Sequence, residues 1–177
     1  ELFSNAGARR FYRGIVRNVE QTDDPDLPEA ATRIADVDAS DARKFLKRLE
    51  KNKKLILHLS EGIGTKAREH FLALHIKDKK WAINENLIGI HCAGLQARDF
   101  ATMANHQASM VWSPMSNLLL YGETAYVKAA KRDGVSIVIG SDWSPTGSKN
   151  LLGELKVARL FSRTHDEIFS DVEIVEM

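Results

Sequence analysis

Short apolar runs recur along this chain, and they constrain its fold more than any other feature. They are rich in Ile, Val and Leu, and most do not alternate with polar residues. This pattern is typical of strands that are buried on both faces of a sheet. We expect strands at residues 11–19, 34–37, 54–60, 86–93, 109–113 and 135–142.

Helical patterns separate these runs. The segment 40–52 opens with a capping residue, Ser40 or Asp41, and then repeats apolar residues at helical spacing. Further helices are expected at 66–76, 96–106, 123–132 and 151–161, and Gly134 is a plausible stop for the fourth of these five. Alternation in units of about 20–30 residues predicts an α/β fold with a parallel sheet.

Two parallel-sheet architectures compete. A doubly wound sheet often carries a glycine-rich phosphate turn after its first strand, and we find none; the glycine spacing in 140–149 does not match a phosphate loop. A β/α barrel needs about 30 residues per strand–helix unit, so 177 residues supply about six of its eight units. We therefore expect a partial TIM-like (β/α) barrel, with the polar stretch 21–29 as a loop and 1–177 as a single domain.

Charge and composition exclude several classes of protein. Lys and Arg total 25 and Asp and Glu total 24, and this balance argues against a dedicated nucleic-acid binder. No apolar run approaches the ~20 residues of a membrane span. The single cysteine, Cys92, excludes an intrachain disulfide and a Cys-rich zinc module. The first ten residues lack the apolar core of a signal peptide, so the expected location is cytoplasmic. The chain starts without Met, and we expect a piece of a longer protein.

Ionisable side chains follow the ends of three predicted strands. The expected strand at 54–60 carries His58 and is followed by Glu61. The strand at 86–93 has His91 near its end, and the strand at 135–142 ends in Asp142. In a barrel the carboxyl ends of the strands converge, so we expect these two imidazoles and two carboxylates to share one catalytic or metal site. Cys92 is interpreted as a buried structural thiol.

These residue types suit one kind of chemistry. Neutral imidazole and carboxylate bind borderline divalent ions such as zinc. Such an ion lowers the pKa of its bound water to about 7 and so generates hydroxide in neutral solution. An aspartate beside that water can accept its proton, a nearby glutamate can donate a proton to substrate, and a second histidine can polarise the attacked carbon.

Four stretches, 56–62, 89–95, 111–122 and 138–158, occur in an order and spacing that resemble the amidohydrolase superfamily, in its cytosine deaminase and chlorohydrolase branch. The resemblance covers residues 11–161. It implies a distorted β/α barrel with one or two metal ions, in which these strands are the third to the eighth.

The resemblance also implies roles for single residues. His58 matches a metal ligand, Glu61 the proton shuttle, and His91 the histidine that contacts the metal-bound water or the developing tetrahedral oxygen. Asp142 matches a residue that is both metal ligand and general base.

Four further residues match the family stretches less directly. Ser116 and Asn117 match a Ser-Asn turn, which we interpret as structural because turn chemistry alone explains it. Trp143 and Ser144 follow the metal aspartate and are expected to line the substrate pocket.

The chain departs from the family pattern in its metal ligands. The family takes two more ligands from a His-x-His pair, and this chain has no such pair.

We predict that the parent protein is a metal-dependent hydrolase of C–N or C–Cl bonds in a cyclic amidine or aryl-type small molecule. Its cofactor would be one divalent ion, zinc or alternatively iron. The competing interpretation is a non-catalytic truncated barrel that binds no metal. Neither nucleic acid nor a membrane is an expected partner, and a homo-oligomer is expected.

Overall fold

In the computed structural model, residues 17–18, 41–51, 54–78, 80–143 and 145–177 are described. They contain one parallel sheet of five strands, and each strand pairs with the next one along the chain. The strands are β1 (Arg17–Asn18), β2 (Leu55–Leu59), β3 (Leu87–His91), β4 (Ser109–Trp112) and β5 (Ser136–Ile139). The predicted α/β class and parallel sheet are confirmed. The expected strand at 34–37 and most of the one at 11–19 lie outside the described residues.

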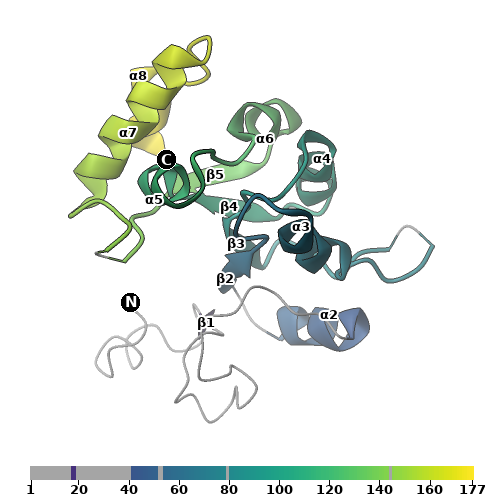
Figure 1. Cartoon of the computed structure of the whole chain (residues 1–177). Coiled ribbons are helices and arrows are strands. Elements are labelled where there is room, and N and C mark those ends of the chain that lie inside the picture. The colour runs from purple at the N-terminus through teal and green to yellow at the C-terminus, as the bar shows by residue number, and fades with distance from the viewer. Residues whose placement is uncertain (1–16, 19–40, 52–53, 79, 144) are drawn as a thin grey trace.

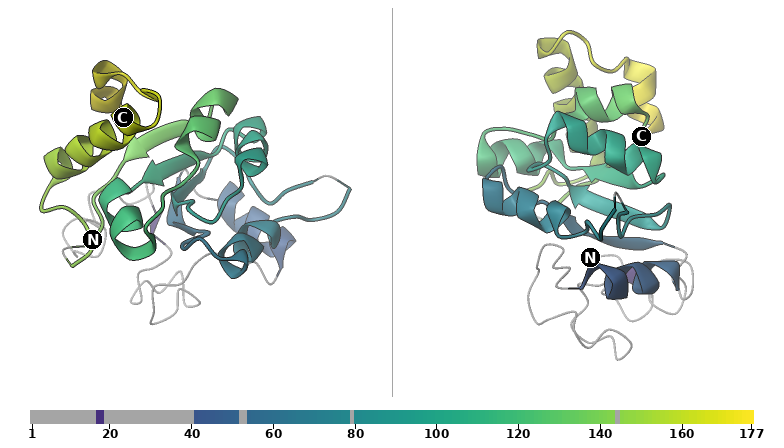
Figure 2. Two further views of the ribbon diagram at one scale, coloured as in Figure 1. Left: turned by 45° about the horizontal axis from the view of Figure 1, so that its top comes forward. Right: turned by 90° about the vertical axis from the view of Figure 1, so that its right-hand side faces the viewer.

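Helices connect the strands and flank the sheet. Figure 1 shows four of them together on one side of the strands: α2 (Ala42–Glu50), α3 (Thr65–Leu72), α4 (Ala97–Asn105) and α6 (Val127–Asp133). The other three lie toward β5, at the opposite end of the sheet from α2 (Figures 1 and 2): α5 (Pro114–Tyr121), α7 (Leu151–Thr164) and α8 (Asp171–Glu176). Among the described residues, none of these helices has the length and apolarity needed to cross a membrane.

Several elements end elsewhere than the sequence predicts. Helix α3 stops at Leu72, because the chain then turns and forms an antiparallel bridge between His75 and Trp81. Helix α6 starts at Val127 and ends, as expected, at Gly134, whose φ of 84° is the left-handed conformation that glycine adopts at helix ends. Strand β5 ends at Ile139, so Asp142 lies three residues beyond the sheet.

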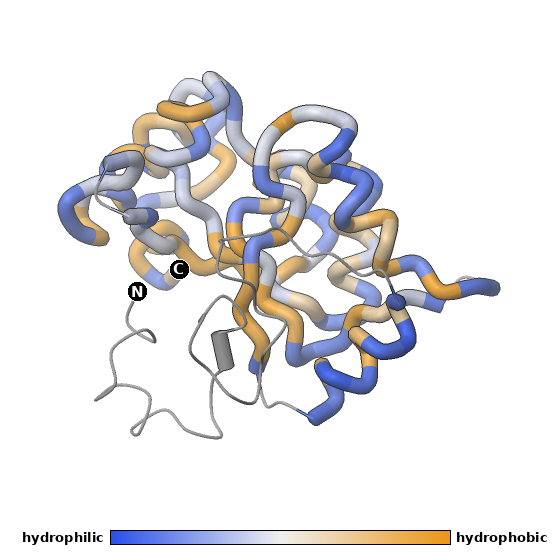
Figure 3. Tube along the Cα trace, turned by 60° about the horizontal axis from the view of Figure 1, so that its bottom comes forward, coloured by the Kyte–Doolittle hydropathy of each residue, from blue (hydrophilic) through white to orange (hydrophobic). Residues whose placement is uncertain are grey.

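The core lies between the sheet and its helices, and Figure 3 shows the hydrophobic residues along the central strands. Leu55, Leu57 and Leu59 of β2 are at most 2 % exposed. Because side chains alternate along a strand, His58 points to the opposite face from Leu57 and Leu59. Trp112, at the end of β4, is fully buried and packs with its ring centroid 5.8 Å from that of Phe161 on α7.

Candidate functional site

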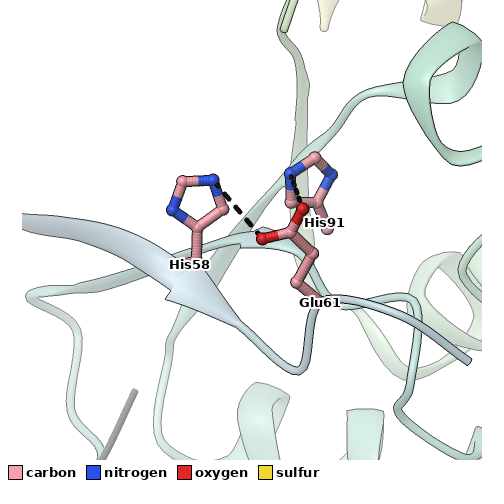
Figure 4. A group of neighbouring side chains, drawn as sticks. All are labelled: His58, Glu61 and His91. Atoms are coloured by element: carbon pink, nitrogen blue, oxygen red, sulfur yellow. Dashed lines mark ion pairs between the residues drawn. The ribbon is translucent and has the colours of Figure 1, made fainter. Parts of the chain in front are cut away.

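Three of the predicted site residues meet at the ends of β2 and β3. His58 lies in β2, Glu61 follows that strand, and His91 is the last residue of β3, opposite Leu59 in the register. Figure 4 shows the Glu61 carboxylate between the two imidazoles. Its oxygens lie 3.8 Å from His58 Nε2 and 3.7 Å from His91 Nε2, and the two rings stack with centroids 5.2 Å apart.

Asp142 joins this group from the segment after β5. Its Oδ2 atom lies 3.9 Å from His91 Nε2. The four side chains that the sequence predicts for one site, His58, Glu61, His91 and Asp142, are therefore neighbours. Cys92 beside them is fully buried, and its thiol contacts the backbone oxygen of Gly89 at 3.6 Å.

The donor set fits a borderline divalent cation. Ligand atoms of His58, Glu61 and His91 all lie within 4.8 Å of one another. The imidazole–carboxylate separations of 3.7–3.9 Å are too long for hydrogen bonds. Among the described residues, the buried Nε2 atom of His91 has no hydrogen-bond partner. Imidazole nitrogen and carboxylate oxygen are ligands of zinc, so a metal ion would satisfy this group. This cluster includes Glu61 and not Asp142, whereas the resemblance assigns the ligand role to His58 and Asp142.

The backbone at these strand ends is unusual. Ser60, His91 and Cys92 have φ values of 52°, 67° and 53°, a left-handed conformation that costs a non-glycine residue on the order of 1–3 kcal/mol. Two backbone hydrogen bonds between the strand ends stabilise this conformation. Cys92 N donates to Leu59 O, and Gly94 N donates to Ser60 O. The chain therefore turns sharply directly after β2, two residues beyond His58, and again at His91.

Hydrogen bonds keep Asp142 ionised. Oδ2 accepts from Ser116 Oγ at 2.6 Å and from Thr146 Oγ1 at 3.4 Å, and Oδ1 accepts from the backbone N–H of Trp143 at 2.8 Å. Partial burial acts to raise the pKa of Asp142. The bonds from Ser116 and Trp143, with the nearby imidazoles, outweigh burial and hold this pKa below its ordinary value of 3.8.

The predicted Ser-Asn turn is wrong. Ser116 and Asn117 lie in the first half of helix α5, which begins at Pro114 because proline suits the first helical position. Both are fully buried, and both bond to site residues: Ser116 to Asp142, and Asn117 Oδ1 to His91 Nδ1 at 2.9 Å. The pair therefore supports the site directly.

Asn117 also orients the His91 ring through its side-chain amide. Its amide Nδ2 donates to Thr124 Oγ1 at 3.1 Å, and the same oxygen accepts from Trp112 Nε1 at 2.7 Å. In this orientation Asn117 Oδ1 faces His91 Nδ1 and suits the tautomer that carries its proton there. The Nε2 atom of that tautomer faces Glu61 and Asp142.

Tyr121 is a site neighbour that sequence reasoning missed. It lies at the end of α5, and its hydroxyl donates to Glu61 Oε1 at 3.1 Å. The available signal is its position four residues after Asn117, which puts both on one face of a helix, and the turn interpretation hides it. Trp143, expected to line the substrate pocket, has a side chain that is 56 % exposed next to Asp142. Ser144 lies outside the described residues.

No protein-family model matches the chain, but it is similar to several known deaminases and hydrolases. It is 25 % identical over 115 residues to a 5'-deoxyadenosine deaminase from Methanothrix thermoacetophila, covering 62 % of this chain and 28 % of that protein. It is 29 % identical over 99 residues to an S-triazine hydrolase from Gordonia rubripertincta, covering 54 % of this chain and 21 % of that protein. The chain thus spans about a quarter of the length of the curated relatives it matches.

Solved structures share the fold. A crystal structure of a triazine hydrolase variant aligns with a TM-score of 0.67 at 16 % identity, over 81 % of this chain and 34 % of that chain. A zinc-bound adenosine deaminase from Xanthomonas campestris aligns with a TM-score of 0.54 at 19 % identity, over 72 % and 31 %. The relatives named here are deaminases and a hydrolase, and the solved structures share the α/β fold of this chain. The predicted resemblance to the amidohydrolase superfamily is confirmed.

Proposed function

We propose that this chain carries part of the active site of a metal-dependent amidohydrolase, built on a partial (β/α) barrel. The reaction would be hydrolysis of a C–N or C–Cl bond in a cyclic amidine or aryl-type small molecule. The observation that carries the proposal is the convergence of His58, Glu61, His91 and Asp142, with 3.7–3.9 Å between imidazole nitrogens and carboxylate oxygens. Deaminases and a triazine hydrolase among the relatives support the type of bond.

The residues would divide the work as follows. His58 and Asp142 would help to hold a divalent ion, zinc or iron, which when bound lowers the pKa of water toward about 7. Asp142, held ionised by Ser116 and Trp143, would accept a proton from the attacking water. Glu61 would carry a proton to the leaving group, while its hydrogen bond from Tyr121 limits its rotation. His91 would contact the attacking water through Nε2.

The remaining ligands would come from residues outside this chain, because the chain contains no His-x-His pair. Zinc sites with hydrolytic function normally use at least three protein ligands. A non-catalytic truncated barrel is the second candidate function, and the lack of a His-x-His pair is the observation that favours it. The two candidates differ in what the full-length protein does with substrate.

The test is release of ammonia or chloride from a panel of aminated and chlorinated heterocycles by the full-length protein. We expect turnover that a chelator removes and added zinc restores, and that Asp142→Asn abolishes. A protein that hydrolyses none of the panel at stoichiometric zinc would support the non-catalytic candidate instead.

A further inference from the structure

A buried carboxylate outside the set of predicted site residues has no role in the chemistry described so far. Glu154 lies in the first turn of α7, and none of its surface is exposed. A buried carboxylate is costly unless hydrogen bonds satisfy both of its oxygens. Here both are satisfied by backbone N–H groups: Oε2 accepts from Met115 at 3.0 Å, and Oε1 accepts from Ser148 at 2.9 Å.

The first of these bonds anchors α5. Met115 is in the first turn of that helix, where backbone N–H groups lack partners within the helix. The residue before the helix, Ser113, makes no side-chain capping bond, so Glu154 supplies the cap from another element. Its negative charge also suits the positive end of the helix dipole.

The second bond anchors the segment that follows Asp142. Ser148 lies in this segment, and Ser141 Oγ donates to its carbonyl oxygen at 2.8 Å. Gly147 packs so tightly on Asp142 that an added Cβ would lie 2.6 Å from the Asp142 backbone oxygen. The position of Ser148 therefore bears directly on the backbone that carries Asp142.

Both anchored segments hold the candidate site. Helix α5 supplies the bonds to Asp142, His91 and Glu61, and the segment after Asp142 supplies the bonds from Trp143 and Thr146. One carboxylate thus bonds to both of the segments that supply hydrogen bonds to Asp142.

We propose that Glu154 is a positioning residue of the active site. It would hold α5 and the segment 142–150 in a fixed position relative to each other, so that Asp142, His91 and Glu61 keep their mutual distances. The expected effect of Glu154 on turnover rests on the proposed hydrolase function. Its expected effect on the two segments rests on the two hydrogen bonds alone.

The test compares Glu154→Gln with Glu173→Gln in the full-length protein. Glutamine has one acceptor oxygen, so either Met115 or Ser148 loses its partner. Glu173 is the matched control, since it caps a different helix, α8, by accepting from Ser170 N at 2.8 Å, away from the site. Glu154→Asp keeps the charge but withdraws the oxygens by one methylene, and it serves if the glutamine variant does not fold.

Two readouts are needed. Hydrogen exchange should become several-fold faster in peptides covering 113–121 and 142–150 in Glu154→Gln, and stay unchanged there in Glu173→Gln. On the substrate that the wild type hydrolyses, kcat should fall about 10–100-fold with KM little changed, as for other residues that orient metal-site groups. Both are measured well below the melting temperature of each variant.

Unchanged exchange in both segments would overturn the proposal, and so would faster exchange with wild-type kcat. If the wild type hydrolyses nothing, the proposed function fails separately. Hydrogen exchange and zinc affinity of Glu154→Gln then test the positioning role. Faster exchange in the two segments with weaker zinc binding supports it, and exchange and zinc affinity that both equal those of the wild type overturn it.

Discussion

The Asp142 carboxylate accepts hydrogen bonds on both oxygens, and this determines how its contribution to stability depends on pH. Its pKa in the folded chain lies below the ordinary 3.8. A carboxyl whose folded pKa is depressed stabilises the protein above its unfolded pKa, and this contribution is lost as pH falls through the folded pKa.

We therefore expect Asp142→Asn to lower the free energy of unfolding by about 1.5–3 kcal/mol at pH 6, the range for hydrogen bonds to a charged group. The difference from wild type should shrink below about pH 3.8. Urea unfolding of the 177-residue chain in chelator at pH 6 and pH 3 measures it. A difference that is the same at both pH values would contradict the role of charge.

Glu61 is expected to act on protons and not on metal binding. Glu61→Gln in the full-length protein should lower kcat by about 10²–10⁴-fold, the usual range for general acid–base catalysis, while zinc content stays unchanged. Steady-state kinetics and metal analysis measure the two quantities. Glu69→Gln, an exposed carboxylate on α3, is the control. Full kcat in Glu61→Gln would exclude the proton-shuttle assignment.

At the residue scale, the sequence predicts the four central side chains because each lies in, or shortly after, a recognisable apolar strand. It does not predict their partners. Tyr121 and Glu154 reach the site through contacts between elements 60 and 39 residues apart in the chain, and no local pattern encodes these. Asn117 was within a recognised motif, but its bond to His91 depends on α5 being helical.

Helix α5 is the element that joins the site together, since it bonds to three of the four central side chains. Asn117 makes the bond that orients the His91 ring. Asn117→Ala should lower kcat about 10–100-fold in the full-length protein. It should also cost about 1–3 kcal/mol of stability, because His91 Nδ1 and Thr124 each lose a buried partner.

The control for that variant is Leu119→Ala on the same helix, where the side chain is 58 % exposed. Kinetics and urea unfolding of both variants make the comparison. If Asn117→Ala and Leu119→Ala have the same kcat, the ring of His91 does not need this support.

Elements with strong apolar runs are predictable, and those that depend on contacts between elements are not. Strands β2, β3 and β4 fall within one or two residues of the predicted segments, because each is a short apolar run between helical patterns. The segment Pro114–Asn117 has turn residues, so its sequence favours a turn. The cap from Glu154 and the packing of α5 against α7 make it a helix.

Across the whole molecule, the edges of the described sheet are the exposed feature with the clearest consequence. Strand β5 lies at one edge; Val138 there is 39 % exposed, and the N–H of Ile139 bonds to the carbonyl of Met177. Unpaired edge strands with apolar side chains promote pairing between chains.

We expect the 177-residue chain to self-associate, and Val138→Lys to reduce this association, since an edge charge opposes strand pairing. Val172→Lys, at an exposed position on α8, is the matched control and should leave association unchanged. Sedimentation velocity over a range of concentrations measures it. A stable monodisperse monomer with a cooperative melt would show that the edges are protected.

The central claim is that these strand-end side chains form part of a metal site, and anomalous scattering at the zinc absorption edge tests it most directly. Crystals of the full-length protein grown with zinc should show one anomalous peak about 2.0–2.2 Å from a nitrogen of His58 and an oxygen of Asp142. A peak bound by His58, Glu61 and His91 without Asp142 would contradict the assigned roles. Stoichiometric zinc with no peak near His58 would contradict the site itself.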